Sequence, residues 1–281
     1  MSPTGGSGRS VTAGLLAWGL SLRSRTAVLD TGRRSTSPWP QWTAPRPGLA
    51  ALPADQPLSR GQVLAATSQV AGPAHHGGGQ WDVLTDHGGW SDPLLSLPED
   101  PAAWYQLAAI GGWQSAVVDT TYAATDDLLT SRSGGSHSRI STWYRLPTSV
   151  PVWCAAATGA GVAALQSAVN VALAAGLPLH RSVIALVETG EGRMPARVRA
   201  AHTMLAPRVH AVVTVPFDAH IRSHGLADAV RIKTKTQRAA TALTEAVVDA
   251  AQTEFGDPLP PAPQPRTLRG SLTSRSVEVS A

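Results

Sequence analysis

Short apolar runs alternate with helical patterns along most of the chain. Runs rich in β-branched residues predict strands at residues 26–30, 81–85, 115–119, 150–156, 182–187 and 211–215. Strands that alternate with helices are typical of βαβ units and a parallel sheet. Several of these runs end in Asp or a small polar residue, and open α/β sheets bind ligands beyond the carboxyl ends of their strands. The pattern therefore predicts an α/β fold with a site at that edge.

Helices are predicted from the spacing of apolar residues. The first begins at Ser10 and carries one apolar face, formed by Val11, Leu15, Trp18 and Leu22. The second repeats this spacing over residues 162–173, and Gly176 follows it as the residue that ends the helix. Two more helices are expected near residues 195–205 and 237–253.

Two segments interrupt this alternation. Residues 35–57 hold six prolines and two tryptophans, which predicts a long loop that crosses the surface. Residues 257–281 begin proline-rich and continue as a polar, arginine-containing stretch, which predicts a disordered basic tail. We therefore expect one domain over residues 1–256, followed by that tail.

Composition narrows the class of protein. With 281 residues and 43% hydrophobic content, the chain is neither fibrous nor wholly disordered. A net charge of +4 is too weak to indicate a nucleic-acid partner by itself. Cys154, the only cysteine, excludes an intramolecular disulfide and a multi-thiolate zinc site. No apolar run reaches the roughly 20 residues of a membrane span, and no signal-peptide pattern opens the chain, so we expect a cytoplasmic protein.

The segment with the clearest chemistry is residues 3–10, Pro-Thr-Gly-Gly-Ser-Gly-Arg-Ser, which runs directly into the first predicted helix. Glycines let backbone N–H groups approach a phosphate, and the helix N-terminus adds the positive end of its dipole. The hydroxyl of Ser10 stands where P-loops hold Mg²⁺. The alternative is a flexible glycine-serine tail.

Residues 4–10 resemble the deviant Walker A loop of the MinD/ParA class of P-loop ATPases, whose pattern is Lys-Gly-Gly-x-Gly-Lys-Ser/Thr. The glycines and the hydroxyl match, whereas Thr4 and Arg9 replace the two lysines. The resemblance implies a three-layer P-loop fold that binds ATP and Mg²⁺. It assigns the phosphates to Gly5, Gly6, Ser7, Gly8, Arg9 and Ser10, and Mg²⁺ to Ser10 and Asp119.

Other family landmarks follow in order, and the similarity spans about residues 2 to 250. Residues 27–30 resemble the second strand, which in the family ends in Asp-x-Asp at switch I; here Asp30 is kept and Gly32 replaces the second Asp. Residues 117–120 resemble the switch II strand, which bears Asp119. Residues 215–218, Val-Pro-Phe-Asp, resemble the loop that in the family passes beside the nucleobase. The resemblance implies that the base contacts Pro216, Phe217 and Asp218.

The departures from the family pattern bear on catalysis. Thr4 carries no charge to reach a partner's phosphates, and the planar fork of Arg9 does not replace a compact ammonium freely. Positioning and electrostatics supply nearly all the catalysis of phosphoryl transfer. We expect weak or absent ATP hydrolysis, with Arg9, Asp30 and Asp119 as the candidate catalytic residues.

Two functions remain open at this point. The first is a nucleotide-dependent switch, with ADP as the product of any hydrolysis and with a homodimer and an unidentified protein as partners. The second is a non-catalytic scaffold for a secretion, conjugation or DNA-segregation assembly.

The start of the chain is unusual for this fold. Only Met1, Ser2 and Pro3 precede the glycines, whereas a P-loop follows a buried central strand. The N-terminal central strand is therefore apparently missing. We expect either that the upstream DNA encodes further apolar residues, or that the loop is frayed and the neighbouring strands close poorly.

Three other features favour structural interpretations. His75, His76 and His87 lie near aspartates, but the surrounding glycines favour loops over a metal site. Cys154 lies within an apolar run, which predicts a buried small hydrophobe. The basic residues Arg231, Lys233, Lys235 and Arg238 are open to two interpretations, non-specific DNA binding and a solvated helix face. The tail lacks the periodicity of an amphipathic membrane anchor.

Overall fold

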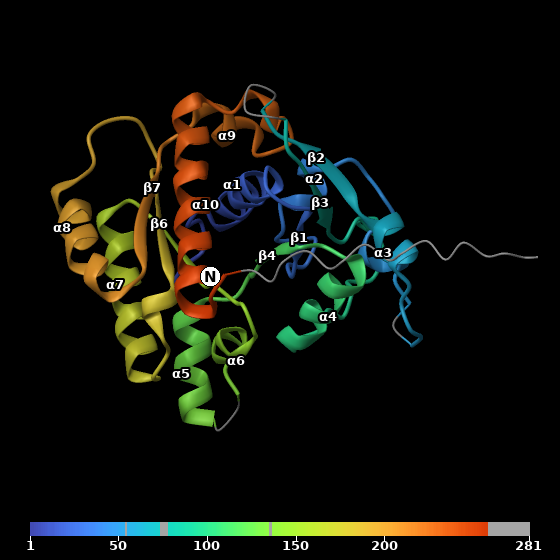
Figure 1. The fold of residues 1–281 in the computed structure, drawn as a ribbon, viewed down its shortest axis with the longest axis horizontal. Helices are drawn as coiled ribbons and strands as arrows, with labels where there is room; N and C mark the ends of the chain where they lie inside the picture. The colour runs from blue at the N-terminus through green and yellow to red at the C-terminus, as the bar shows by residue number, and fades with distance from the viewer. Residues whose placement is uncertain (54, 74–77, 135–136, 258–281) are drawn as a thin grey trace, which may run out of the picture.

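The computed structural model describes residues 1–53, 55–73, 78–134 and 137–257, and within them the strands form two sheets (Figure 1). The first sheet has the order β2 (Ser68–Ala71), β3 (Gln80–Leu84), β1 (Thr26–Asp30) and β4 (Ser115–Asp119). The second has the order β5 (Val152–Ala156), β6 (Val183–Val187) and β7 (Ala211–Val215). Every pair is parallel except β2 with β3. The predicted α/β class with a mostly parallel sheet is confirmed.

Helices cover both faces of these sheets, which gives three layers (Figure 1). One face carries α1 (Arg9–Ser21) and α10 (Thr234–Phe255), which pack against each other. The opposite face carries α4 (Pro101–Gly111), α5 (Ala124–Gly134), α6 (Arg139–Arg145), α7 (Gly159–Ala174) and α8 (Ala196–Leu205). The connecting segments hold α2 (Trp39–Trp42), α3 (Arg60–Ala66), α9 (Ala219–His224) and the 3₁₀ turns Leu49–Ala51, Leu179–Arg181, Ala206–Arg208 and Ala229–Arg231.

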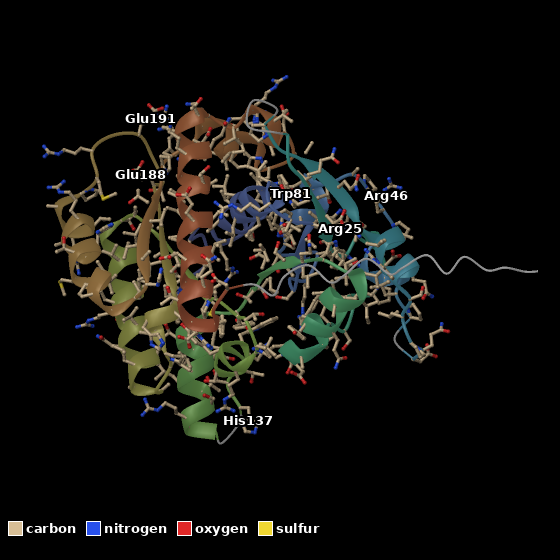
Figure 2. All side chains as sticks on the ribbon, viewed as in Figure 1. Arg25, Arg46, Trp81, His137, Glu188 and Glu191 are labelled. Carbon is tan, nitrogen blue, oxygen red and sulfur yellow. The ribbon has the colours of Figure 1, made fainter. Side chains whose placement is uncertain are left out.

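Helix α1 ties the two sheets together through the core. Its Leu15 and Trp18 are buried in one cluster with Val117 of the first sheet and Cys154 of the second. Cys154 is 2% exposed, which confirms the prediction of a buried small hydrophobe. Trp81 of β3, labelled in Figure 2, is buried in the same cluster. Burial of this shared apolar surface is the main force that holds the layers together.

Two residues occupy the space between the sheets. The Met1 ammonium donates to the carbonyl of Val152 at 2.8 Å, and the N–H of Cys154 donates to the carbonyl of Met1 at 2.9 Å. On the other side Ser2 forms a parallel bridge with Ala123. Strands β4 and β5 do not pair with each other in the described chain. Met1 and Ser2 therefore lie between the two sheets and contact both of them, and Ser2 is fully buried.

Residues 35–57, predicted as a surface loop, are exposed over much of their described length but also hold short helical turns and buried residues. The segment contains α2 and a 3₁₀ turn, and Trp39 is fully buried. Pro40 stands in the first turn of α2, where a missing N–H leaves no helical hydrogen bond unmade. Burial of the large indole outweighs the tendency of the prolines toward irregular surface structure.

Most of the predicted strands and helices match the structure. Strands over 26–30, 115–119 and 211–215 match β1, β4 and β7, and the four predicted helices match α1, α7, α8 and α10 within a few residues. The antiparallel β2 was not predicted, because its four residues include Ser68 and Gln69 and give no apolar run. The predicted tail lies outside the described residues after Asp257. No helix among those described is long and apolar enough to cross a membrane.

Candidate functional site

The glycine-rich segment folds into a turn that needs its glycines. Gly6 has φ 68° and Gly8 has φ 75°, the left-handed region that favours glycine. A Cβ atom on Gly8 would lie 2.8 Å from Cγ1 of Val187, at the end of β6. Ser7 between the two glycines is buried. The segment is therefore a shaped loop that packs against the second sheet.

This loop leads into a helix end with free hydrogen-bonding capacity. Gly8 is the N-cap of α1, and no side chain caps that end. By contrast, α7 has Thr158 at its N-cap, where the hydroxyl accepts from the N–H of Gly161 at 3.1 Å. Unpartnered first-turn N–H groups and the helix dipole together favour an anion. The start of α1 therefore keeps the features that suit a phosphate.

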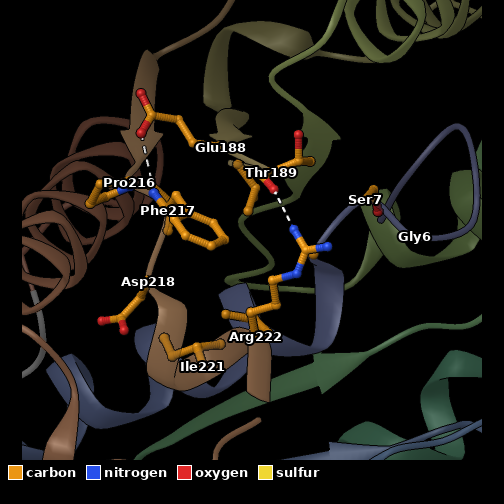
Figure 3. A pocket seen from close by; sticks show the side chains of 13 residues that line it. Gly6, Ser7, Glu188, Thr189, Pro216, Phe217, Asp218, Ile221 and Arg222 are labelled. Carbon is orange, nitrogen blue, oxygen red and sulfur yellow. Dashed lines mark hydrogen bonds between the residues drawn. The ribbon is translucent and has the colours of Figure 1, made fainter. Parts of the chain in front are cut away.

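A pocket of about 280 Å³ lies between this loop and the carboxyl ends of β6 and β7 (Figure 3). Its walls bring together the residues expected at a nucleobase and part of the expected phosphate loop: Gly6, Ser7, Gly8, Pro216, Phe217 and Asp218. Gly5, Arg9 and Ser10 are not among the lining residues. Three polar residues, Glu188, Thr189 and Arg222, also line the pocket and were not predicted as site residues.

The pocket carries two carboxylates, Glu188 and Asp218, and one cationic side chain, Arg222, on a largely apolar wall. Oε2 of Glu188 accepts from the N–H of Phe217 at 3.2 Å. Arg222 donates to the carbonyl of Thr189 at 3.1 Å, and its Cζ lies 5.9 Å from the centroid of the Phe217 ring. Figure 3 shows both hydrogen bonds, with the Arg222 guanidinium pointing toward Thr189. An aromatic ring beside polar groups of both signs suits a flat heterocycle with donors and acceptors.

The carboxylate of Asp218 stabilises the starts of α9 and α10. It accepts from the N–H of His220 at 3.0 Å, from the N–H of Lys233 at 3.0 Å and from the hydroxyl of Thr236 at 2.9 Å. Burial opposes ionisation here, but these hydrogen bonds prevail and lower the pKa of Asp218. Asp218 thus joins the start of α9 to the start of α10, and its side chain in Figure 3 points away from Phe217.

Arg9 is directed at Asp119, the residue that the resemblance assigns to switch II. Its Nε lies 3.5 Å from Oδ1 of Asp119, and its Nη1 donates to Oγ of Ser2 at 3.0 Å and to the carbonyl of Tyr122 at 3.4 Å. The side chain of Asp119 is only 3% exposed. A buried carboxylate beside a guanidinium keeps its charge compensated. The first sheet thus places Asp119 directly beneath the start of α1.

The residues around Asp119 fit a magnesium ion. Oδ2 of Asp119 accepts from Nε1 of Trp39 at 2.9 Å. Among the described residues, the buried hydroxyl of Thr120 has no hydrogen-bond partner, and the buried Oδ1 of Asp119 has only the ion pair with Arg9. Buried polar atoms without partners are rare in folded proteins, and carboxylate and hydroxyl oxygens are ligands that Mg²⁺ prefers. Ser10 follows Arg9 in the first turn of α1.

Both carboxylate oxygens of Asp30 accept hydrogen bonds, unlike those of Asp119. Its Oδ2 accepts from the hydroxyls of Ser37 and Thr85, each at 2.6 Å, and its Oδ1 accepts from the N–H of Gly32 at 2.9 Å. Burial raises the pKa of Asp30 to about 7, although these hydrogen bonds act in the opposite direction. The carboxyl therefore ties the end of β1 to the end of β3 and to the following turn.

The histidines give no sign of a metal site. His75 and His76 lie outside the described residues. Nε2 of His87 is 3.0 Å from Oγ of Ser68 and 3.3 Å from Oγ1 of Thr43. Within residues 1–53, 55–73, 78–134 and 137–257, no group of three or more His, Cys, Asp or Glu residues could hold a metal ion.

The arrangement of loop, pocket and strand ends can be compared with solved structures. The chain is similar to the cell division ATPase MinD of Pyrococcus furiosus, with a TM-score of 0.51 and 16% identity over 88% of this chain and 97% of the other. It is also similar to apo McdA of Cyanothece, with a TM-score of 0.50 and 16% identity over 89% and 96% of the two chains. A variant of Cyanothece McdA in complex with ATP gives a TM-score of 0.51 and 13% identity over 88% and 94%.

The chain has a MinD-like P-loop ATPase fold. No protein-family model and no curated protein matches its sequence. In this MinD-like fold the glycine-rich loop and the carboxyl ends of β4, β6 and β7 meet at one edge.

Two contributors to the site escaped sequence reasoning for different reasons. Glu188 follows β6 directly, so the rule that ligands bind beyond strand ends could have found it. Trp39 lies in the proline-rich segment, where no periodicity marks a buried residue. Its contact with Asp119 joins positions 80 residues apart, and no local pattern reports such a pair.

Proposed function

We propose that this protein binds ATP with Mg²⁺ and acts as a nucleotide-dependent switch with weak or absent hydrolysis. The observation that carries the proposal is the shaped glycine loop at an uncapped helix start, placed between a partly apolar pocket and a buried aspartate. Backbone N–H groups of residues 5–10 would bind the phosphates. The base would lie against Pro216 and Phe217.

The charged groups suggest how nucleotide binding changes the site. Arg9 and Asp119 neutralise each other in the present arrangement. A bound triphosphate would attract Arg9, and Asp119 would then be free to help Ser10 hold Mg²⁺, which balances charge on the phosphates when bound. The ion pair between Arg9 and Asp119 would be replaced by two others, Arg9 with the triphosphate and Asp119 with Mg²⁺. Each buried charge would therefore keep a partner of opposite charge.

Weak hydrolysis follows from what the loop lacks. No lysine stands in it, and Thr4 is an exposed, uncharged residue. Catalysis of phosphoryl transfer depends on positioned positive charge at the transition state. We therefore propose that the output is a conformational or dimerisation change read by a protein partner rather than rapid ATP turnover.

The test is a thermal-shift titration with Mg-ATP. The wild-type protein should melt at a higher temperature, because a ligand that binds only the folded state at 100 times its dissociation constant stabilises it by about 2.7 kcal/mol. The variant Gly8→Ala should lose this shift, since a Cβ at φ 75° and 2.8 Å from Val187 would distort the loop.

Gly112→Ala is the matched control. Gly112 also has a positive φ, of 68°, and a Cβ there would lie 2.8 Å from Cζ of Arg60, far along the chain from the loop. This variant should lose similar stability, about 1–2 kcal/mol, and keep the Mg-ATP shift. A well-folded wild-type protein that shows no shift at millimolar Mg-ATP would contradict the proposal and favour the scaffold function.

A further inference from the structure

Trp39 links the two strand ends that bear the buried carboxylates. Its Nε1 donates to Oδ2 of Asp119 at 2.9 Å, at the end of β4. Its backbone N–H donates to Oγ of Ser37 at 3.1 Å, and that hydroxyl donates to Oδ2 of Asp30 at 2.6 Å, at the end of β1. Residues 37–39 therefore bridge Asp30 and Asp119 through a continuous chain of hydrogen bonds.

The indole is held firmly. Trp39 is fully buried, and its ring lies edge-on to Trp42 with centroids 5.3 Å apart. It also packs against α1, because a Cβ on Gly14 would lie 3.2 Å from Cη2 of Trp39. A side chain fixed by packing on several sides can orient a hydrogen-bonded neighbour.

The contact divides the two oxygens of Asp119. Oδ2 is taken by the indole N–H, so the carboxylate is rotated with Oδ1 toward Arg9 and the start of α1. Oδ1 is the oxygen without a hydrogen-bond partner among the described residues. The main chain of Asp119 is fixed separately, since its carbonyl accepts from the N–H and the hydroxyl of Thr31.

We propose that Trp39 is a positioning residue for Mg²⁺ binding: its indole N–H holds Asp119 so that Oδ1 faces the loop. The inference rests on the proposed function. The proline-rich segment would thus contribute to the site through Trp39, which orients the carboxylate of Asp119. Partners that orient a metal-binding carboxylate typically change metal affinity by about 10–100-fold when they are removed.

The test measures ATP affinity by isothermal titration calorimetry, with Mg²⁺ and with EDTA, in wild type, Trp39→Phe and Trp113→Phe. Trp113 is the matched control, because its Nε1 donates to Oδ2 of the buried Asp82 at 2.6 Å, within the same sheet but away from the loop. Wild type should bind ATP more tightly with Mg²⁺ than with EDTA. Trp39→Phe should lose at least tenfold of that Mg²⁺-dependent gain and keep its affinity in EDTA, whereas Trp113→Phe should keep both.

The outcomes separate this inference from the function on which it rests. A full Mg²⁺-dependent gain in Trp39→Phe, or an equal loss in Trp113→Phe, overturns the positioning role while ATP binding stands. No ATP binding by the wild type overturns the proposed function and this inference with it. If Trp39→Phe does not fold, Ser37→Ala serves instead, because it removes the hydroxyl that holds the Trp39 backbone; it should reduce the same gain, and an unchanged gain overturns the inference.

Discussion

The two sheets differ in what their polar groups bind at the carboxyl edge. In the first sheet, Asp30 and Asp119 are buried and accept mainly from side chains, namely Ser37, Thr85 and Trp39. In the second, the groups that follow the strands accept from backbone N–H groups: Thr158 from Gly161, Glu188 from Phe217, and Asp218 from His220 and Lys233.

This difference separates an adjustable side of the site from a fixed one. The hydroxyls of Ser37 and Thr85 can rotate toward a ligand that offers a better contact, whereas the packed indole of Trp39 and the backbone partners are set by the fold. Glu188 and Glu191 follow β6, at the carboxyl edge of the second sheet (Figure 2). The first sheet thus supplies groups suited to change with a bound phosphate and cation, and the second supplies the shape of the pocket.

The largest expected effect is on stability, and it comes from Asp30 of the first sheet. Its folded pKa is about 7 against an ordinary 3.8, so folding favours the protonated form. The stability that this group contributes is therefore complete below about pH 4 and is lost as pH rises through 7, by up to about 4 kcal/mol. Asp30→Asn should remove this fall, since an amide can still accept from Gly32 and donate to the two hydroxyls.

Urea denaturation of both proteins between pH 4 and 8 measures the effect. The two stability curves should agree near pH 4 and diverge toward neutral pH, with the Asn variant more stable. Curves that stay parallel over the whole range would show that Asp30 is ionised in the folded protein, and the first sheet would then resemble the second in holding a charged carboxylate.

On the fixed side, Gly161→Ala should be costly. A Cβ on Gly161 would lie 2.2 Å from the carbonyl oxygen of Ala156, so α7 would have to move away from β5. We expect a loss of about 3 kcal/mol in the free energy of unfolding. Gly159→Ala, two residues earlier, is the control, because its nearest contact would be an ordinary 3.6 Å to Cδ of Arg197. A small loss at Gly161 would mean that this side is adjustable as well.

The features of the two sheets that could be predicted from the sequence are those that depend on residues close together in the chain. Glycines at 5, 6 and 8 and the apolar face of α1 are local patterns, and they predicted the loop and the helix correctly. Strand ends such as Asp119 and Val215 also follow from local apolar runs. These local signals were enough to predict the fold class.

The orientation of side chains depends on distant residues and was not predictable. The ion pair of Arg9 with Asp119, more than a hundred residues away in sequence, was not predicted. Asp218 lines the pocket, but the hydrogen bonds that its carboxylate accepts from Lys233 and Thr236 were not predicted. In each case a charged group satisfies the nearest buried partner of opposite charge or donor type, and only the folded chain determines which partner that is.

The smallest expected effect concerns the start of α7, the fixed counterpart of the start of α1. Thr158→Ala removes the hydroxyl that caps α7 and should lower the free energy of unfolding by about 1 kcal/mol. Thr158→Ser keeps the hydroxyl and should cost much less. Urea denaturation measures the loss, and a Mg-ATP thermal shift on the same variants should be unchanged from wild type. If Thr158→Ala instead altered the shift, the start of α7 would belong to the ligand site, and the division between an adjustable and a fixed sheet would not hold.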